Sequence, residues 1–150
     1  MEADGDVPRA KEILMKKGLE VAAKKGSRLA KEGRVEAYVH MGSKIAVLLE
    51  VNCETDFVAR NADFCQFTKD VAMHIAAMNP AYISAEDVPE DVLAEAKDRE
   101  AFLKETCLIL QPFVKDPGKT LQDYLNSIII KIGENIRIRR FTRYKVGEDV

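Results

Sequence analysis

The sequence predicts an α+β domain in which helices pack on one face of a small three-stranded antiparallel sheet, preceded by an N-terminal helix. Two strand-like segments, residues 34–41 and 44–53, are separated only by Gly42-Ser43, which is typical of a tight hairpin turn. A third strand-like segment, residues 135–146, follows three helical segments near the C-terminus. We expect this last strand to pair antiparallel with the hairpin and the helices to cover one sheet face.

Composition agrees with one globular domain. The chain has 150 residues, of which 47% are hydrophobic and 32% charged, which is enough for a real core and excludes a disordered or collagen-like chain. The formal net charge is only -2, which argues against a general polyanion binder. The balance hides opposed regions, because residues 8–34 sum to +6 and residues 86–105 to -5.

The first helix is expected over residues 8–26, with Pro8 in its first turn and apolar residues at roughly helical spacing. This stretch is basic and includes Lys24 and Lys25 near its end. Its charge is typical of a solvated helix face, and the alternative interpretation is a docking surface.

The hairpin strands differ in pattern. In the first strand Val35, Ala37 and Val39 alternate with polar or amphipathic residues, so we expect one wet face, and His40 is placed on that face near the hairpin tip. His40 is then either a surface residue or a partner contact. The second strand is apolar on both faces and is expected inside the sheet.

Three helical segments follow the hairpin. Asn61 is a candidate cap for a helix that ends at Asn79-Pro80. The acidic segment predicts an exposed helix from about Pro89 to residue 105, and a loop over residues 111–117 leads to a helix over residues 119–131. The first of these helices has one apolar stripe, which consists of Phe64, Phe67, Val71, His74, Ile75 and Met78.

The templates for enzyme chemistry fail. Cys53, Cys65 and Cys107 form no CxxC pair, which excludes the usual zinc and dithiol sites and favours a reducing compartment. Gly118-Lys119-Thr120 resembles the end of a phosphate-binding loop, but the required earlier glycine is Phe113. Neither His40 nor His74 has a metal or catalytic partner at motif spacing, so no metal, cofactor or covalent chemistry is expected.

The most informative segment is residues 55–61, which follow the apolar second strand directly. It places Phe57 beside Asp56 in a strand-to-helix connection, where functional residues are often found. The alternative is structural, with Thr55 or Asp56 capping a helix whose first turn buries Phe57.

These residues resemble the translation elongation factor Ts family, the guanine-nucleotide exchange factors of elongation factor Tu. The central match is VNCETDFVARN, residues 51–61. Further matching segments occur in the same order along the chain: GLEVAAKK at 18–25, MHIAA at 73–77, QPFV at 111–114 and IGENIRIRR at 132–140. The resemblance extends over residues 2–148.

The resemblance implies a function and a set of contacts. Thr55, Asp56, Phe57 and Val58 would enter elongation factor Tu beside its magnesium site and promote GDP release, with no covalent step. Secondary contacts would come from four places in the chain, namely His40, Ile132, Gly133 and the pair Lys24 and Lys25. Charge complementarity at that lysine pair would raise the association rate more than the affinity.

The resemblance also implies a domain organisation. Residues 1–26 would be the remnant of an N-terminal three-helix (UBA-like) module, of which the chain begins at the last helix, as expected of a trimmed or naturally shortened form. Residues 27–150 would be the core and dimerisation domain. Because only one TDFV segment occurs, the chain is expected to work as a homodimer.

One other function stays open on the residues alone. A ribosome- or RNA-associated module could use the basic first helix together with Arg137, Arg139, Arg140 and Arg143 on phosphates. Few exposed aromatic residues accompany these arginines, so no direct nucleic-acid contact is expected. No apolar run approaches the ~20 residues that span a bilayer, which predicts a cytosolic protein without a membrane contact.

Overall fold

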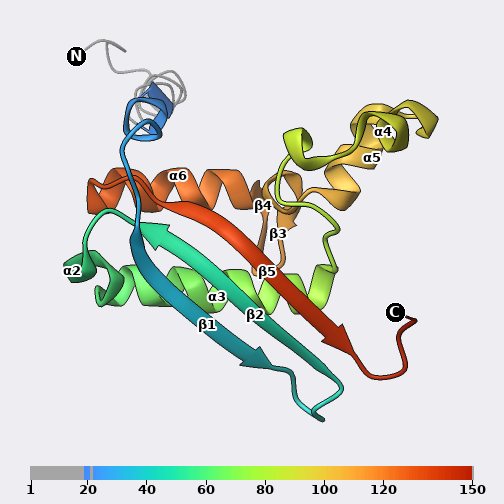
Figure 1. The fold of residues 1–150 in the computed structure, drawn as a ribbon, viewed down its shortest axis with the longest axis horizontal. Coiled ribbons are helices and arrows are strands. Elements are labelled where there is room, and N and C mark those ends of the chain that lie inside the picture. The colour runs from blue at the N-terminus through green and yellow to red at the C-terminus, as the bar shows by residue number, and fades with distance from the viewer. Residues whose placement is uncertain (1–18, 21, 150) are drawn as a thin grey trace.

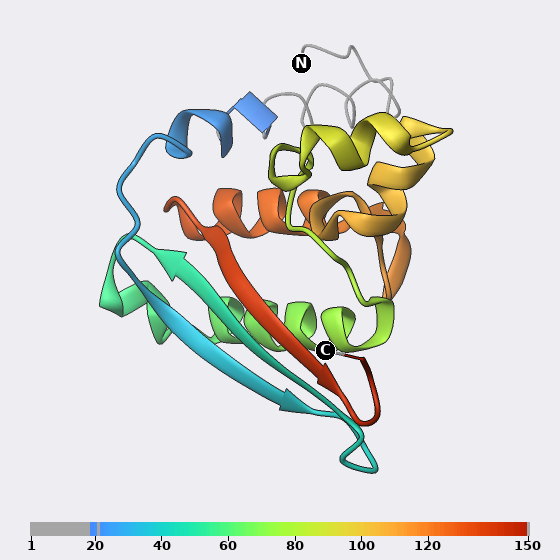
Figure 2. The ribbon, with the colours of Figure 1, turned by 45° about the vertical axis from the view of Figure 1, so that its right-hand side comes forward.

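The structure is a computed structural model that describes residues 19, 20 and 22–149. Its main sheet has the order β1-β2-β5 and is antiparallel throughout, with β1 at Glu32–Val39, β2 at Ile45–Cys53 and β5 at Arg137–Lys145 (Figure 1). The two long helices, α3 at Ala62–Met78 and α6 at Leu121–Ile132, lie on the same side of this sheet (Figure 2). The predicted fold class is confirmed, and so are the three strands.

The central strand is β2, as its apolar pattern predicts. Val47, Leu49, Val51 and Cys53 alternate along it and are buried on the side that faces the helices. Its two neighbours pair with it along nearly its whole length, with Tyr38 of β1 opposite Val47 and Phe141 of β5 opposite Leu49. The core therefore lies between β2 and α3.

The prediction for the faces of β1 is wrong. Val35 and Val39 are 61% and 62% exposed, whereas Glu36 and Tyr38 are half-buried on the helix side. The reason is register: residues directly opposite on antiparallel strands share a face, and Tyr38 and Glu36 stand opposite the buried Val47 and Leu49. His40 thus continues the helix-side row of β1, although it remains exposed at the hairpin.

Helix α3 has the predicted ends and the predicted stripe. The Asn61 side chain accepts hydrogen bonds from the amides of Asp63 and Phe64, and the helix ends at Asn79, whose φ of 47° is left-handed. Five of the six stripe residues are fully buried, and the sixth, Met78, is exposed at the helix end. The stripe packs on the sheet as expected.

Two segments differ from the prediction. The acidic region forms two short helices, α4 at Glu90–Glu95 and α5 at Arg99–Thr106, in place of one. Asp98 interrupts it, because its carboxylate accepts a hydrogen bond from Ala101 N–H and caps α5. Neither helix buries a residue, and both lie away from the sheet, so the predicted exposure is confirmed (Figure 1). Two 3₁₀ turns flank them, η1 at Ala85–Asp87 and η2 at Leu108–Leu110.

The predicted loop over residues 111–117 contains a small second sheet. Strands β3, Pro112–Phe113, and β4, Asp116–Thr120, pair antiparallel and bury Phe113. The Pro-Gly-Lys composition of β4 gave no strand signal, since this pairing depends on the anchoring of Phe113 in the core. Helix α6 starts two residues later than predicted, where Thr120 and Asp123 form a capping box.

The small sheet is attached to α3 by buried polar residues. His74 is fully buried; its Nδ1 accepts a hydrogen bond from Val114 N–H, and its Nε2 donates to the Gln111 side chain at 2.9 Å. Nearby, the carboxylate of Asp70 accepts hydrogen bonds from Lys115 and from the hydroxyl of Tyr124. These contacts require a neutral imidazole at His74, because Nδ1 must stay an acceptor.

We predict that acid weakens the fold through His74. Burial lowers the pKa of His74 below its usual value of 6.5, against an opposing effect of the Gln111 hydrogen bond. Its contribution is therefore complete above pH ~6.5 and is lost as pH falls below that value, where the unfolded chain binds the proton. The free energy of unfolding in urea should fall by up to about 1 kcal/mol between pH 7.5 and 5.5.

His74→Asn keeps an acceptor near Nδ1 but cannot be protonated, so it should lower stability at all pH values and flatten this slope. His40→Asn, at the other histidine of the chain, is the matched control and should leave the slope as in the wild type. An unchanged slope in His74→Asn would contradict the assignment.

Candidate functional site

The candidate site is the turn between β2 and α3. It contains α2, a single helical turn at Asp56–Ala59, which lies at the end of the sheet opposite the β1–β2 hairpin (Figure 1). Val58 and Ala59 face the core and are buried. Phe57 points the other way and is 78% exposed. The ring is therefore accessible to another molecule, on a turn whose next two residues are fixed in the core.

Of the structural alternative for this segment, the burial of Phe57 is wrong, whereas the helix cap is confirmed at Thr55. The Thr55 hydroxyl accepts a hydrogen bond from Val58 N–H at 3.3 Å. Asp56 is exposed and forms an ion pair with Arg60 one turn later, at 3.2 Å. Surface pairs of this kind contribute little stability, so Asp56 is available for other acceptor contacts.

The end of α6 lies beside α2. Gly133 ends that helix with a φ of 84°, a conformation that favours glycine, and both Ile132 and Gly133 are half-buried. The next residue, Glu134, accepts hydrogen bonds from the backbone N–H groups of Glu54 and Thr55 and from the Thr55 hydroxyl. The structure thus brings the predicted residues 55–58 and 132–133 together.

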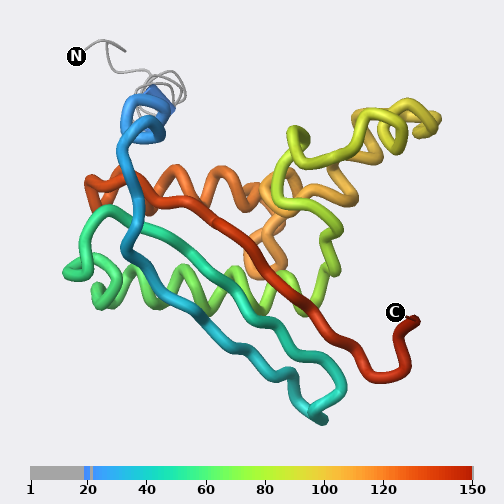
Figure 3. The backbone as a smooth tube through the Cα atoms, in the orientation of Figure 1, coloured from blue at the N-terminus to red at the C-terminus, as the bar shows by residue number. Residues whose placement is uncertain are grey.

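Glu134 is a residue of the site that sequence reasoning missed. It lies within the matching segment IGENIRIRR, but its partners are 79 and 80 positions away, and no local pattern connects them. Figure 3 shows the two chain turns at the same end of the molecule.

The remaining predicted contacts lie elsewhere. His40 is at the opposite end of β1, where its Nδ1 is 2.9 Å from the Tyr38 hydroxyl. Lys24 and Lys25 belong to the helical residues 22–25, and of these Lys24 is exposed and Lys25 half-buried. Residues 8–18 and residue 21 of the expected first helix lie outside the described residues.

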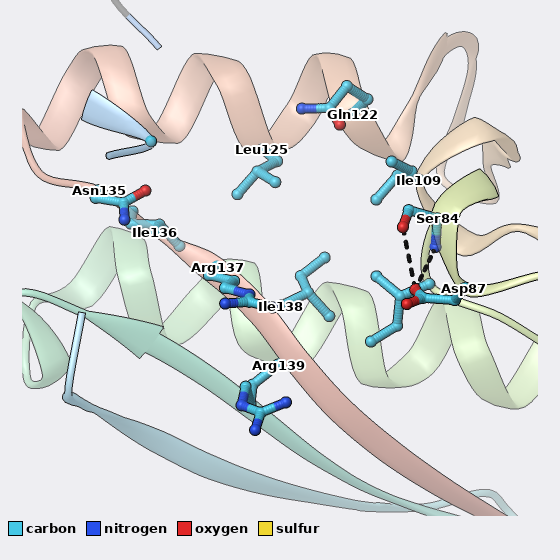
Figure 4. A pocket seen from close by; sticks show the side chains of 12 residues that line it. Ser84, Asp87, Ile109, Gln122, Leu125, Asn135, Ile136, Arg137, Ile138 and Arg139 are labelled. Carbon is cyan, nitrogen blue, oxygen red and sulfur yellow. Dashed lines mark hydrogen bonds between the residues drawn. The ribbon is translucent and has the colours of Figure 1, made fainter. Parts of the chain in front are cut away.

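The arginines of the RNA alternative do not form one surface. Arg143 is almost buried, and its guanidinium donates to the carbonyl of Ala76 at 3.0 and 3.3 Å. Arg140 pairs with Glu50 at 2.7 Å on the sheet face away from the helices. Of these four arginines, Arg137 and Arg139 line the same groove, which has a volume of about 340 Å³ and lies between β5 and α6 (Figure 4).

That groove combines polar and apolar side chains. Asn135 and Gln122 line it together with Leu125, Ile138 and Ile109, and Ser84 and Asp87 close one end through their mutual hydrogen bonds (Figure 4). With two arginines and no exposed aromatic ring among its lining residues, it lacks a platform for stacking bases.

Cys53 and Cys107 are buried and are poor nucleophiles. Burial raises the pKa of Cys53 to about 11, and burial also raises the pKa of Cys107, so both remain thiols at neutral pH. Among the described residues, no group of three or more His, Cys, Asp and Glu side chains is arranged to hold a metal ion. In residues 19–20 and 22–149, no helix combines the length and hydrophobicity that a bilayer crossing requires.

Fold and site together define an α+β binding domain that presents an aromatic side chain on a short, fixed turn. The family model described as Elongation factor TS matches residues 9–101 and 98–148. Similar relatives include the elongation factor Ts proteins of Caldanaerobacter subterraneus subsp. tengcongensis (49% identical, covering 100% of this chain and 86% of the relative) and Geobacter sulfurreducens (48%, 98% and 79%). The chain belongs to the elongation factor Ts family and is a translation elongation factor.

Proposed function

We propose that this chain binds elongation factor Tu and promotes the release of GDP from it. The observation that carries the proposal is the exposure of Phe57 on a turn whose neighbouring residues are buried or hydrogen-bonded. An aromatic side chain held in this way enters a partner's pocket at a low cost in conformational entropy. The family membership of the chain supports elongation factor Tu as that partner.

Exchange then follows from differential binding. The partner holds GDP together with a Mg²⁺ that requires near-octahedral ligands at about 2.0–2.1 Å. A small displacement of the partner's helices by Phe57 would disturb this coordination and so weaken the binding of GDP. A factor that prefers the nucleotide-free partner must weaken nucleotide binding by the same ratio. The chain supplies only binding free energy, and the cellular excess of GTP sets the direction.

Other residues have supporting roles in this proposal. Asp56 accepts hydrogen bonds from the partner and orients the approach of Phe57, while Val58 anchors the turn from inside. Ile132 and Gly133 extend the contact beside α2. His40 and the lysines Lys24 and Lys25 are more distant contacts. Residues 1–26 are the remnant of a docking module, and residues 27–150 are the core that follows it in sequence. The complex forms in the cytosol.

We predict that Phe57→Ala slows exchange by about tenfold or more, because truncation of a central aromatic anchor typically costs 2 kcal/mol or more. Release of fluorescent GDP from elongation factor Tu, followed by stopped flow, measures this. The fold should be unaffected, since the Phe57 ring is mostly in solvent.

Met78→Ala is the matched control, since Met78 is an exposed apolar residue at the far end of α3. It should release GDP at the wild-type rate. A wild-type chain that does not accelerate release would exclude the exchange function. A normal rate in Phe57→Ala would exclude only the role of this side chain.

We also propose that the chain forms a homodimer through the sheet face opposite the helices, here called the open face. In the strand register its residues are Gly33, Val35, Ala37, Val39, Ala46, Leu48, Glu50, Asn52, Arg137, Arg140, Thr142 and Tyr144, of which Asn52 is buried. Leu48, at its centre, is 54% exposed, and Val35 and Val39 are more exposed still. The charges of Glu50 and Arg140 are paired with each other. A two-fold axis through this face would bury the exposed apolar side chains of one copy against the same residues of the other.

We predict that Leu48→Glu gives a monomer, because two carboxylates would be buried at the centre of the interface. Sedimentation at micromolar concentration should give about twice the 16.8 kDa chain mass for the wild type and the single mass for the variant. Ile130→Glu, on the exposed surface of α6, should stay dimeric. A monomeric wild type would contradict the proposal.

A further inference from the structure

Two glutamates form a crossed pair of hydrogen-bonded contacts between the start of α2 and the end of α6. Glu134, from the α6–β5 connection, reaches across to residues 54 and 55. Its Oε1 accepts from Glu54 N–H at 3.0 Å and from Thr55 N–H at 3.1 Å, and its Oε2 accepts from the Thr55 hydroxyl at 2.7 Å. Glu54 reaches in the opposite direction, and its Oε2 accepts from Asn135 N–H at 3.3 Å.

The pair also includes the segment before β1. Arg28 lies 3.8 Å from the Glu54 carboxylate, and its backbone carbonyl accepts a hydrogen bond from the Asn135 side chain at 2.7 Å. Three chain segments that are distant in sequence are therefore tied together at one point. We call the contacts of Glu134 and Glu54 the carboxylate clamp.

The clamp determines the orientation of the Thr55 hydroxyl. This hydroxyl donates its proton to Glu134 and accepts from Val58 N–H, so the same oxygen joins the clamp to the N-terminus of α2. A single four-residue helical turn is not stable alone, because the conformational entropy lost in ordering its backbone exceeds the free energy gained from its first hydrogen bond. The turn therefore depends on its cap and on the burial of Val58 and Ala59.

We propose that Glu134 is a positioning residue for exchange, which holds Phe57 in the direction required to enter the partner; this inference rests on the proposed function. Glu134 acts through Thr55 and α2, and its negative charge lies at the N-terminal end of that turn, where it is favourable. Without it, part of the binding free energy of Phe57 would be consumed in ordering the turn. The clamp also fixes the spacing between Phe57 and Gly133.

The test combines Glu134→Ala and Phe57→Ala, singly and together, in the GDP-release assay at a series of factor concentrations. Loss of a charge-assisted acceptor for three donors should lower the exchange efficiency by about tenfold in the wild-type background. In the Phe57→Ala background the same substitution should lower it by less than about twofold, because Glu134 acts through the missing ring. Equal reductions in both backgrounds would overturn the inference.

Two further variants separate positioning from folding. Glu134→Gln keeps an acceptor for the backbone N–H groups and should recover most of the rate if Glu134→Ala folds poorly. Glu100→Ala, which removes an exposed ion pair with Lys104, is the matched control and should be as fast as the wild type.

Amide hydrogen exchange provides a readout that is independent of the partner. In Glu134→Ala the N–H groups of Glu54, Thr55 and Val58 should exchange at least about tenfold faster, while those in the middle of α3 are unchanged. Uniformly faster exchange would indicate a purely structural role and overturn the inference. If the wild type accelerates release and Glu134→Ala is equally fast, the clamp inference fails alone; if the wild type is inactive, the proposed function fails first.

Discussion

The packing of β2 on α3 is the constraint on which the rest of the structure depends. Four alternate residues of β2 are buried against a helix whose facing stripe is itself inaccessible to solvent. Side chains that are directly opposite on paired strands share a face of the sheet. The packing of β2 on α3 therefore determines which side of β1 and of β5 faces the helices. It therefore creates the open face as well as the core.

The same constraint produces the site. Cys53, the last residue of β2, is buried, and Asn61 already caps α3, so the chain must reverse direction within seven residues. It does so with one helical turn, in which Val58 and Ala59 complete the core. Successive residues on a helix point about 100° apart, so Phe57 lies about 150° from the middle of the face that Val58 and Ala59 bury, and it points away from the core. The exposure of Phe57 thus follows from the burial of its neighbours, on a turn whose start is held by the Thr55 cap and by Glu134.

The parts of this structure that were predictable from sequence are those with strong local periodicity. The strand segments and α3 with its Asn61 cap have such patterns, and they were located to within a few residues. The faces of β1 could not be obtained in this way, because alternation shows that two faces differ but not which one the neighbouring strand selects. Val35 and Val39 are apolar and yet exposed for this reason.

Two other features depended on contacts between distant segments. The β3–β4 hairpin lacks the residue types that are typical of strands. The backbone N–H groups that donate to Glu134 are 79 and 80 positions away in the sequence. A β-bulge in β5 is a third case. Ile138 pairs with Val51 and Arg140 with Glu50, which leaves Arg139 unpaired and shifts the alternation by one residue. Without this shift Arg140 would point into the core and Phe141 out of it.

The bulge also determines which β5 residues lie on the open face. The shift places Arg140 on the open face opposite Glu50, and the two side chains form an ion pair at 2.7 Å. The open face lies opposite the helices, whereas α2, which carries the exposed Phe57, lies at one end of the sheet (Figure 1). Two copies packed through their open faces would therefore leave both Phe57 side chains accessible. Each copy would keep its own carboxylate clamp, because Glu54 and Glu134 belong to the same chain. The proposed dimer contact on the sheet and the proposed partner contact on α2 would therefore be compatible.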